Sequence, residues 1–498
     1  MPRRSHALSL ALPPHDPDVP VHRWLWTTLR DAILEGRLRP GTRLPGTRDL
    51  ARQHGLARGT IVAAFDQLRA EGYLEGRRGS GTYVSRTLPD DLLQVPRSSP
   101  ERGARAPRAL PRQSKPAREV IPFVSGDQGG SRAFRANQPA LDLFPTTLWA
   151  QVAARRYRRA TPGLLLGCPP FGYRPLRDAI ADYLNTSRGV RCTPDQVAVV
   201  SGAQEALDLI GRLLLEPGMH VGVEDPGYPG AVAAFQAQGA AVMPLRVDQE
   251  GCVRPDRRAR LRLVYVTPGH QFPLGVTMSL PRRLELLEWA HAAGALVVED
   301  DYDSEFRYHG RPVPALQGLD RHDVVLYVGS LSKVLFPALR LGYMVVPADL
   351  VDRLAALKSV TSRHAPLLEQ AVLCDFMEAG HLGRHLRRMR EVYAERRDAL
   401  QEGARAELGE WLELPAIDAG LQASARLRKG ISGESAVAAA ATRGVEVLSL
   451  SRYWRGREQW PGVILGFAAV DATEIRRGIH QLATALQTLA KRRAPADD

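Results

Sequence analysis

Apolar residues near the amino end of the chain recur at the spacing of an α-helix. The stretch from 21 to 36, VHRWLWTTLRDAILEG, carries its apolar side chains on one face: Leu25, Leu29, Ala32 and Ile33. This stripe predicts an amphipathic helix that packs on a small core. Gly36 and the following loop, RPGTRLPG, are expected to end the helix, because glycine and proline interrupt helical structure.

Two further helices and a hairpin are predicted in the next stretch, TRDLARQHGLARGTIVAAFDQLRAEGYLEGRRGSGTYV. The second of these helices repeats apolar residues at i, i+4 and i+7, namely Ile61, Phe65 and Leu68. Its exposed N-terminus then carries Arg58, Gly59 and Thr60, and helix-turn-helix proteins present this end of a recognition helix to base edges. The hairpin sets Arg77 and Arg78 beside a Gly-Ser-Gly tip, within reach of phosphates or the minor groove.

The periodic apolar residues then give way to a polar segment. Residues 87–119 are rich in proline, arginine and serine. Because such a segment cannot bury enough apolar surface to fold alone, we predict a flexible basic linker, with an ordered surface strap as the alternative. The expected domains are a DNA-binding module at 18–86 and a large domain at 120–490, joined by this linker.

In the large domain, short apolar runs bounded by turns alternate with longer amphipathic stretches. This alternation is typical of an α/β domain built on a mostly parallel sheet. In such sheets, ligands bind outside the carboxyl ends of the strands, so residues that follow buried runs are the first candidates for chemistry.

Composition narrows the setting in which the protein works. The chain has 498 residues, 44% of them hydrophobic and 24% charged, which is typical of a globular protein of several domains. A net charge of +13 favours a polyanionic partner. The four scattered cysteines form no CxxC motif and fit a reducing cytoplasm. No apolar run has the length of a membrane span, and no metal site is predicted.

Two patches of the large domain suit a ligand with a phosphate and an aromatic ring. VAVVSGAQEALDLIGRLLL predicts a strand, a turn at Gly202, Ala203 and Gln204, and a helix whose first N–H groups face outward, which favours phosphate. A glycine at such a turn also serves geometry alone. In VEDPGYPGA, Tyr228 follows a strand and is suited to stacking on a ring, or to ordinary packing.

Two more patches carry ionisable groups. ALVVEDDYDSEF ends an apolar strand in acids that surround Tyr302: Glu299, Asp300, Asp301, Asp303 and Glu305. They are expected to point into a ligand crevice or to form a solvated acidic loop. YVGSLSKVLFPALRLGY offers the amine of Lys333, the hydroxyls of Ser330 and Ser332, and the guanidinium of Arg340. A lysine here is either a solvated loop residue or a desolvated amine held for a Schiff base.

The amino-terminal module resembles the GntR-type winged helix. The pattern G-x-x-LPS-x-R-x-LA corresponds to Gly41–Ala51, and AEGYL…R-x-GSGT-x-V corresponds to Ala70–Val84. Two departures stand out, Gly46-Thr47 for paired serines and Ala57-Arg58-Gly59-Thr60 for Ser-Arg-Asn-Thr. The resemblance implies that DNA is contacted by Arg43, Arg48, Arg58, Thr60, Arg77 and Arg78, whereas the pattern alone also allows a three-helix protein-interaction domain.

The large domain resembles the fold-type I aminotransferases, which have a smaller C-terminal α/β subdomain. With the winged helix attached, nearly the whole chain is similar to the MocR-type regulators of the GntR superfamily, on the motifs FGYRPLRDAIADYL-x3-RGVRC, VTPGHQFPLGVTMSLPRR, EDDYDSEFRYHG and SLSKVLFPALRLGY. The resemblance implies pyridoxal 5′-phosphate (PLP) as the cofactor and a homodimer, since fold-type I sites form at a dimer interface. An Asp opposite a protonated pyridine nitrogen is what such a site needs.

The resemblance also implies a role for each site residue. Lys333 bonds the cofactor, Asp300 pairs with its pyridine nitrogen, Tyr302 bonds its phenolic oxygen and Tyr228 stacks on its ring. The phosphate is held by Gly202, Ala203, Gln204, Ser330, Ser332 and Arg340. His270 and Gln271 line the pocket.

Some features of aminotransferases do not carry over. The arginine that usually clamps the substrate carboxylate precedes the last core strand's LGF, and here Ile464 stands in that place. LLLGCPPFGY also has no clear counterpart of the tyrosine that reaches a partner's phosphate, and Gly230 adds no side chain beside Tyr228. Weak positioning of an amino acid favours binding over full transamination.

The resulting hypothesis is a cytoplasmic, homodimeric transcription regulator. It binds a double-stranded DNA operator and senses PLP, or an amine or amino acid effector, through its aminotransferase-like domain. One alternative is a working aminotransferase with an accessory DNA-binding arm. Another is a DNA-binding protein whose large domain only dimerises, although the intact lysine, acid and tyrosines disfavour it.

Overall fold

The computed structural model describes residues 12–15, 19–77, 81–86, 132–309, 314–456 and 460–493. The chain divides into two units, Met1–Ala109 and Leu110–Asp498, and each is described by itself. Arg78 and the predicted linker at 87–119 lie outside the described residues. No helix in the described part of the chain is long and apolar enough to cross a membrane.

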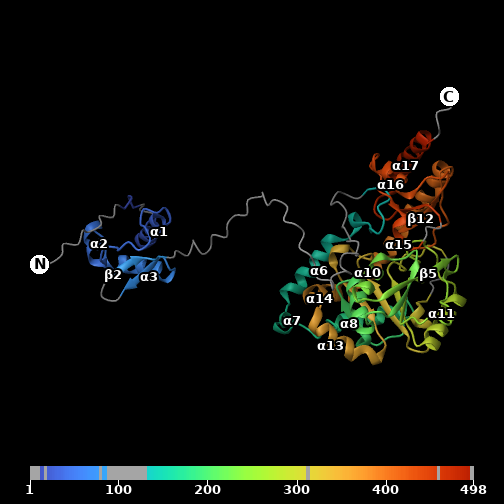
Figure 1. Ribbon diagram of the computed structural model, residues 1–498, viewed down its shortest axis with the longest axis horizontal. Helices are drawn as coiled ribbons and strands as arrows, with labels where there is room; N and C mark the ends of the chain where they lie inside the picture. Colours follow the sequence, from blue (N-terminus) through green and yellow to red (C-terminus); the bar gives the residue numbers. More distant parts are fainter. Residues whose placement is uncertain are drawn as a thin grey trace. The chain divides into compact units, whose positions relative to one another are not determined.

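The first unit is a three-helix domain with a hairpin, shown in blue in Figure 1. Its elements are α1 (Val21–Leu34), α2 (Thr47–His54), α3 (Arg58–Ala70), β1 (Leu74–Arg77) and β2 (Gly81–Val84). The two strands pair antiparallel, with Leu74 opposite Val84. Gly55, at φ 66°, ends α2 in the left-handed conformation that glycine adopts readily.

The core of this unit is formed by the faces that the apolar spacing predicted. Buried residues on α1 and α3 include Leu25, Leu29, Ala32, Ile33, Ile61, Phe65 and Leu68. They join Leu44, Leu50, Leu74 and Val84 from the other elements in one cluster. The predicted helices and hairpin are therefore present, and the apolar stripes are what hold them together.

The second unit is built on an eight-stranded sheet in the order β3-β10-β9-β8-β7-β4-β5-β6. The strands are β3 (Val197–Val200), β4 (His220–Asp225), β5 (Ala241–Asp248), β6 (Gly251–Cys252), β7 (Leu263–Val266), β8 (Leu296–Asp301), β9 (Val325–Ser330) and β10 (Gly342–Val345). Strands β5, β4, β7, β8 and β9 run parallel, and β10 lies antiparallel between β3 and β9. The mostly parallel sheet is confirmed.

Helices cover both faces of this sheet. The helices of the unit up to residue 403 are α6 (Thr146–Arg158), α7 (Pro162–Leu166), α8 (Arg174–Ser187), α9 (Ala203–Leu214), α10 (Pro229–Ala237), α11 (Leu280–Ala293), α12 (Leu316–Leu319), α13 (Val351–Thr361), α14 (Leu367–Glu378) and α15 (His381–Gly403). Alternate strand residues face opposite ways. Val298 and Leu326 pack with α9, α10 and α13, whereas Val297 and Val325 pack with α11.

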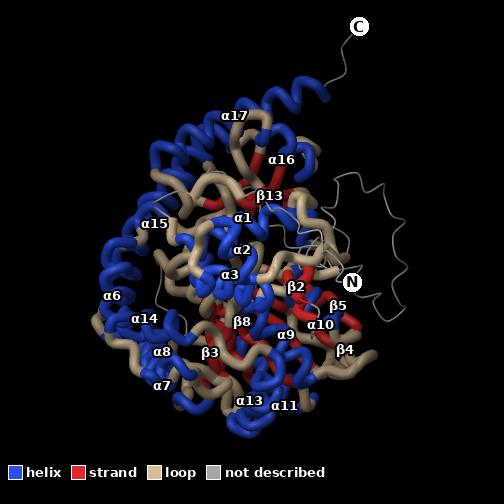
Figure 2. Tube along the Cα trace, turned by 90° about the vertical axis from the view of Figure 1, so that its left-hand side faces the viewer, coloured by secondary structure: helices blue, strands red, loops and turns tan. Residues whose placement is uncertain are grey.

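A smaller antiparallel sheet forms the C-terminal part, coloured orange to red in Figure 1. Its order is β11 (Leu412–Glu413), β12 (Gln422–Leu427), β14 (Gly462–Gly466) and β13 (Leu448–Ser449). The helices α16 (Gly433–Ala441) and α17 (Ala472–Arg493) accompany it, and Figure 2 shows α16 beside β13. This is the expected smaller α/β subdomain.

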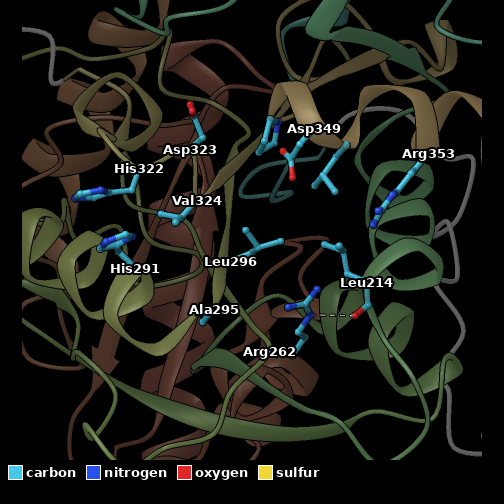
Figure 3. A pocket seen from close by; sticks show the side chains of 13 residues that line it. Leu214, Arg262, His291, Ala295, Leu296, His322, Asp323, Val324, Asp349 and Arg353 are labelled. Carbon is cyan, nitrogen blue, oxygen red and sulfur yellow. Dashed lines mark hydrogen bonds between the residues drawn. The ribbon is translucent and has the colours of Figure 1, made fainter.

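The parallel strands present two different edges. At their carboxyl ends, β4, β8 and β9 finish at Asp225, Asp301 and Ser330. At the amino ends lies a cavity of about 330 Å³ whose lining includes Arg262 and Leu296 (Figure 3). None of the predicted site residues lines this cavity. Ligands of open α/β sheets bind at the carboxyl edge, which directs attention there.

Candidate functional site

Lys333 lies in the turn that follows β9, at the carboxyl edge of the sheet. Its Nζ donates a 2.6 Å hydrogen bond to the backbone oxygen of Asn137. Burial lowers the pKa of this amine to about 8, although the negative charges of Asp303 and Asp300 oppose that shift. An amine with a lowered pKa is a better nucleophile at neutral pH than an ordinary lysine.

Asp300 is one of the two buried carboxyls whose negative charges act on this amine. Its Oδ2 accepts a 2.7 Å hydrogen bond from the hydroxyl of Tyr265, on the neighbouring strand β7. Its Oδ1 is buried and has no hydrogen-bond partner among the described residues. Burial raises the pKa of Asp300 to about 7, and the bond from Tyr265 and the charge of Lys333 partly offset that rise. One oxygen is thus available to a positively charged donor, which would stabilise the carboxylate.

Aromatic rings lie beside these ionisable groups. Tyr228, just before α10, stacks with Tyr265 at a centroid distance of 6.5 Å and an interplanar angle of 29°. Phe272 meets the edge of Tyr228 at 5.8 Å and that of Tyr302 at 5.8 Å. A Cβ on Gly230 would come within 2.5 Å of the Tyr228 ring, so no other residue fits there without displacing the tyrosine.

The turn before α9 and the loop before β10 converge. Gly202, at φ 102°, precedes Ala203, the first residue of α9, and Gln204 donates from Nε2 to the oxygen of Gly230 over 3.0 Å. A Cβ on Gly202 would lie 3.7 Å from the guanidinium of Arg340. Free N–H groups of a helix start and a guanidinium together favour a phosphate.

Ser330 and Ser332 lie beside Lys333 in the same loop. Ser330 ends β9, and its hydroxyl accepts a 3.3 Å hydrogen bond from the N–H of Ser332. Arg340 follows a short 3-10 turn, Pro337–Leu339, and takes the left-handed conformation at φ 51°. Strand β9 (Val325–Ser330) ends at Ser330, which puts this residue at the carboxyl edge of the sheet.

Half-buried Tyr302 and buried His270 and Asp303 form a cluster, and the negative charge of Asp303 also acts on the Lys333 amine. The Nδ1 of His270 lies 3.0 Å from the Tyr302 hydroxyl and 3.0 Å from Oδ1 of Asp303. Burial raises the pKa of Tyr302 far above its usual range, so its hydroxyl keeps its proton at neutral pH. Gln271 donates from Nε2 to Glu224 and to the backbone of Pro226, and so links two loops of the site.

Three of the five acids around Tyr302 serve the fold instead of the site. Asp301 pairs with buried Arg188 at 2.7 Å. Glu299 accepts the N–H groups that begin α12, and Glu305 accepts the hydroxyl of Tyr183. Only Asp300 and Asp303 contribute to the electrostatic environment of Lys333. The acidic cluster predicted from the sequence is thus divided between structure and site.

Some site residues escaped the sequence analysis. Asn137 contributes a backbone oxygen, which no side-chain pattern reveals. Tyr265 stands in the otherwise apolar, buried strand LVYV. Because a buried tyrosine hydroxyl usually has a hydrogen-bond partner, its presence in such a strand is a signal that could have identified it. Ile464 is buried in β14 opposite Ser424 and Leu448, so the position expected for the arginine clamp carries no charge. Arg452 is exposed.

The first unit presents the basic residues expected to contact DNA on the loop before α2, on α2, on α3 and on the hairpin. Arg43, Arg48 and Arg58 are exposed, and Thr60 lies in the first turn of α3. The side chain of Arg43 lies against Gly81, at the start of β2. Arg77 is ion-paired with Glu75 at 2.7 Å, and its guanidinium stacks 4.7 Å above the ring of Tyr83.

Two family models match the chain. Residues 26–84 match "Bacterial regulatory proteins, gntR family", and residues 133–420 match "Aminotransferase class I and II". Among curated proteins, the chain is 41% identical to the probable rhizopine catabolism regulatory protein MocR of Rhizobium meliloti, over 95% of each. It is 33% identical to the pyridoxine biosynthesis regulator PdxR of Corynebacterium glutamicum, over 96% of this chain and 98% of that one.

Among solved structures, the chain is similar to the α-aminoadipate aminotransferase LysN of Thermus thermophilus, with a TM-score of 0.67 and 30% identity. This match covers 76% of the chain and 96% of LysN, which was solved with a phosphopyridoxyl-leucine bound. The domain match and this likeness imply PLP as the cofactor.

The residues at the carboxyl edge fit PLP. The bare Oδ1 of Asp300 suits a protonated ring nitrogen, and the glycine turn beside Arg340 suits a phosphate. When bound, PLP supplies an aldehyde that bonds a primary amine and withdraws electrons from it. The chain belongs to the MocR-type transcriptional regulators of the GntR superfamily, DNA-binding proteins whose large domain has the fold of the PLP-dependent aminotransferases.

Proposed function

We propose that PLP, or an amine that reacts with it at Lys333, changes how tightly this regulator binds its operator. The observation that carries the proposal is the lowered pKa of Lys333 beside a buried carboxyl with one bare oxygen. An unpaired buried carboxyl oxygen costs free energy, and Glu224, Asp301 and Glu305 each have one as well, but of these four acids only Asp300 is a charge that acts on the Lys333 amine. The site gains stability when a cationic ring nitrogen donates a hydrogen bond to Oδ1 of Asp300.

The cofactor site is proposed to consist of three groups of residues. Asp300, Tyr302, Tyr228 and His270 surround the ring, and Lys333 bonds it. The phosphate is held by Gly202, Ala203, Gln204, Ser330, Ser332 and Arg340. Support comes from the convergence of Gly202 and Arg340 and from the stacked rings of Tyr228 and Tyr265. The domain limits remain those proposed from the sequence, 18–86, 87–119 and 120–490.

The effector is proposed to be an amine or amino acid that exchanges with Lys333 on the cofactor. Exchange needs only an accessible site and a nucleophilic amine. Full transamination also needs a fixed substrate carboxylate, and Ile464 offers no charge at the expected clamp. The relatives named for rhizopine catabolism and pyridoxine biosynthesis support control by a small metabolite.

We propose a homodimer that engages paired half-sites. An apolar surface on the large unit supports a second copy as its partner, since Leu166 is 89% exposed and Val360 is 81% exposed. They come from α7 and α13, and Gly167, the residue after α7, lies beside His364 in the loop that follows α13. Large exposed apolar side chains mark association surfaces. Because its partner is chromosomal DNA, the protein is proposed to act in the cytoplasm.

Operator affinity tests the proposal. A duplex selected for binding from a random pool is titrated with cofactor-free full-length protein, with PLP, and with PLP plus candidate amines. We expect PLP to change the affinity and an effector amine to change it again. Equal affinities in all three conditions would reject cofactor sensing and leave a plain DNA-binding protein.

The alternative is a working aminotransferase, favoured by the intact Lys333 and its neighbours. The two functions differ in turnover. An amino acid should shift the visible spectrum of the loaded protein, while cycling with a keto acid stays very slow. Sustained multiple turnovers with a common amino acid and keto acid pair would promote the enzyme to the principal function.

A further inference from the structure

One histidine nitrogen lies within hydrogen-bond distance of three oxygen atoms in the site. The Nδ1 of His270 is 3.0 and 3.1 Å from the two carboxylate oxygens of Asp303 and 3.0 Å from the hydroxyl of Tyr302. His270 and Asp303 are 4% and 1% exposed, so water does not compete for these contacts. The proposed cofactor contacts do not explain why a buried carboxylate contacts this histidine.

The histidine and the acid are held tightly in place. A Cβ on Gly420 would overlap the ring of His270 and approach Oδ2 of Asp303 to 2.8 Å. On the other side, a Cβ on Gly275 would lie 3.2 Å from Nε2 of His270. Both glycines have positive φ angles, of 83° and 81°. Two loops therefore close on the pair, and its geometry is fixed by backbone.

The chemistry of the contact decides which nitrogen carries the proton. A lone pair on Nδ1 would face the lone pairs of the Asp303 carboxylate, which is repulsive, whereas an Nδ1–H donates to it. Carboxylates fix the tautomer of their histidine in this way in the catalytic triads of serine proteases. Nδ1 is then a donor whether the ring is neutral or cationic.

This protonation of Nδ1 determines which hydrogen bonds the Tyr302 hydroxyl can make. Because Nδ1 has no free lone pair, the Tyr302 hydroxyl cannot donate to it. The hydroxyl proton is thereby left for another acceptor. Titratable groups that face Tyr302 are Asp300, Asp301 and Asp303 from β8 and the turn after it, and Glu224 from β4. The negative charges of Asp300 and Asp303 act both on Tyr302 and on Lys333, the cation that follows β9.

We propose that Asp303 and His270 are a positioning pair that reserves the Tyr302 hydroxyl proton for the ring oxygen of bound PLP. This inference rests on the proposed cofactor site. It assigns to Asp303 a role beyond structure, which is to set the tautomer of a histidine that itself need not touch the cofactor. The substitution Asp303→Asn removes the carboxylate that holds the proton on Nδ1, so that a bare Nδ1 can accept from the Tyr302 hydroxyl.

A double-mutant cycle tests the pair. The four proteins are the native chain, Tyr302→Phe, Asp303→Asn and the double variant, each loaded with PLP. The quantity measured is the pH midpoint of the visible absorption band, which depends on the proton shared by the ring oxygen and Lys333. A Tyr302 donor competes with that proton, so Tyr302→Phe should raise the midpoint, by about one pH unit for a hydrogen bond to a charged oxygen.

The shift caused by Tyr302→Phe should differ between the native protein and the Asp303→Asn variant. In the Asp303→Asn background the Tyr302 proton is already diverted to His270, so the same Tyr302→Phe change should shift the midpoint little. Loss of the Asp303 charge affects both proteins of that background and cancels in the comparison. Equal shifts in the two backgrounds would overturn the proposal, as would the absence of any shift in the native background.

A second measurement needs no cofactor. In full-length protein labelled with ¹⁵N-histidine, the His270 signals are identified by their loss in His270→Gln. A protonated Nδ1 supports the pair, and a bare Nδ1 with protonated Nε2 overturns it. If the chain failed to bind PLP at Lys333, the proposed function would fall, whereas the ¹⁵N result would still decide the tautomer.

Discussion

The hydroxyl of Tyr265 donates a 2.7 Å hydrogen bond to Oδ2 of Asp300 and leaves Oδ1 of the same carboxyl without a partner in the described part of the chain. One buried hydroxyl thus sets the orientation of the acid that is proposed to pair with the cofactor. The ring of Tyr265 also stacks on Tyr228. A residue of the sheet core therefore supports two sides of the site at once.

Removing only this hydroxyl should weaken the cofactor site without removing the ring. In Tyr265→Phe the carboxyl of Asp300 loses a bond that favours its charged form, so its pKa rises further above 7. We expect PLP to dissociate roughly fivefold more readily, since a hydrogen bond contributes about 1 kcal/mol. Equilibrium dialysis at about pH 7.5, near the raised pKa of Asp300, measures this.

A matched variant separates positioning from stability. Tyr327 donates to Asp301 over 2.5 Å on the neighbouring strand, and that acid serves Arg188. Tyr327→Phe should lower the unfolding temperature about as much as Tyr265→Phe does, yet leave PLP affinity unchanged. If both variants lost cofactor equally, Tyr265 would be only a packing residue.

The two acids beside Lys333 should differ in their effect on cofactor retention. Asp300→Ala removes the partner of the cationic ring nitrogen, and a charge-assisted hydrogen bond of this kind contributes about 1.5–3 kcal/mol, or roughly 10- to 100-fold in affinity. Asp303→Ala should cost less, because Asp303 acts through His270. Equal PLP occupancy of the two variants after dialysis would mean that the pairing acid is misassigned.

The lowered pKa of Lys333 predicts how cofactor capture depends on pH. Below about pH 8 the amine is mostly protonated and cannot attack, so the rate of PLP binding should rise with pH and level off above 8. Stopped-flow absorbance of cofactor-free protein mixed with PLP follows the rate. A lysine peptide serves as the control and should keep accelerating to about pH 10. The same continued rise in the protein would show that Lys333 is not desolvated.

DNA binding should depend on exposed arginines of the first unit. Arg58→Ala and Arg48→Ala each remove one proposed phosphate contact, which should reduce affinity and flatten the salt dependence by about one charge. Arg37, paired with Glu35 beyond α1, supplies the control variant Arg37→Ala and should bind normally. Normal operator binding by Arg58→Ala and Arg48→Ala at moderate salt would move the recognition surface elsewhere.

Features that are local in the sequence were predicted well. The buried faces of α1 and α3 follow from helical spacing alone, which brings Leu25 next to Leu29 and Ile61 next to Phe65. Lys333 and Asp300 were proposed as site residues because residues at the ends of buried strands collect at one edge of a parallel sheet, and the structure places both at that edge. In both cases neighbours in space are set by a repeating geometry.

Features that depend on tertiary contacts were not accessible. The acceptor of the Lys333 amine is the backbone of Asn137, 196 residues away. The antiparallel insertion of β10 between β3 and β9 has no local pattern, and it fixes where Arg340 meets Gly202. The division of the acidic cluster around Tyr302 into structural acids and site acids likewise depends on Arg188, which is distant in sequence and pairs with Asp301.

The central claim is that the Lys333 amine links the cofactor to DNA binding, and PLP titrations of operator affinity test it most directly. Fluorescence anisotropy compares native full-length protein with Lys333→Ala, using Lys429→Ala as the lysine control. We predict that PLP shifts operator affinity in the native and Lys429→Ala proteins and leaves Lys333→Ala unchanged. An identical PLP response in native protein and Lys333→Ala would contradict the account.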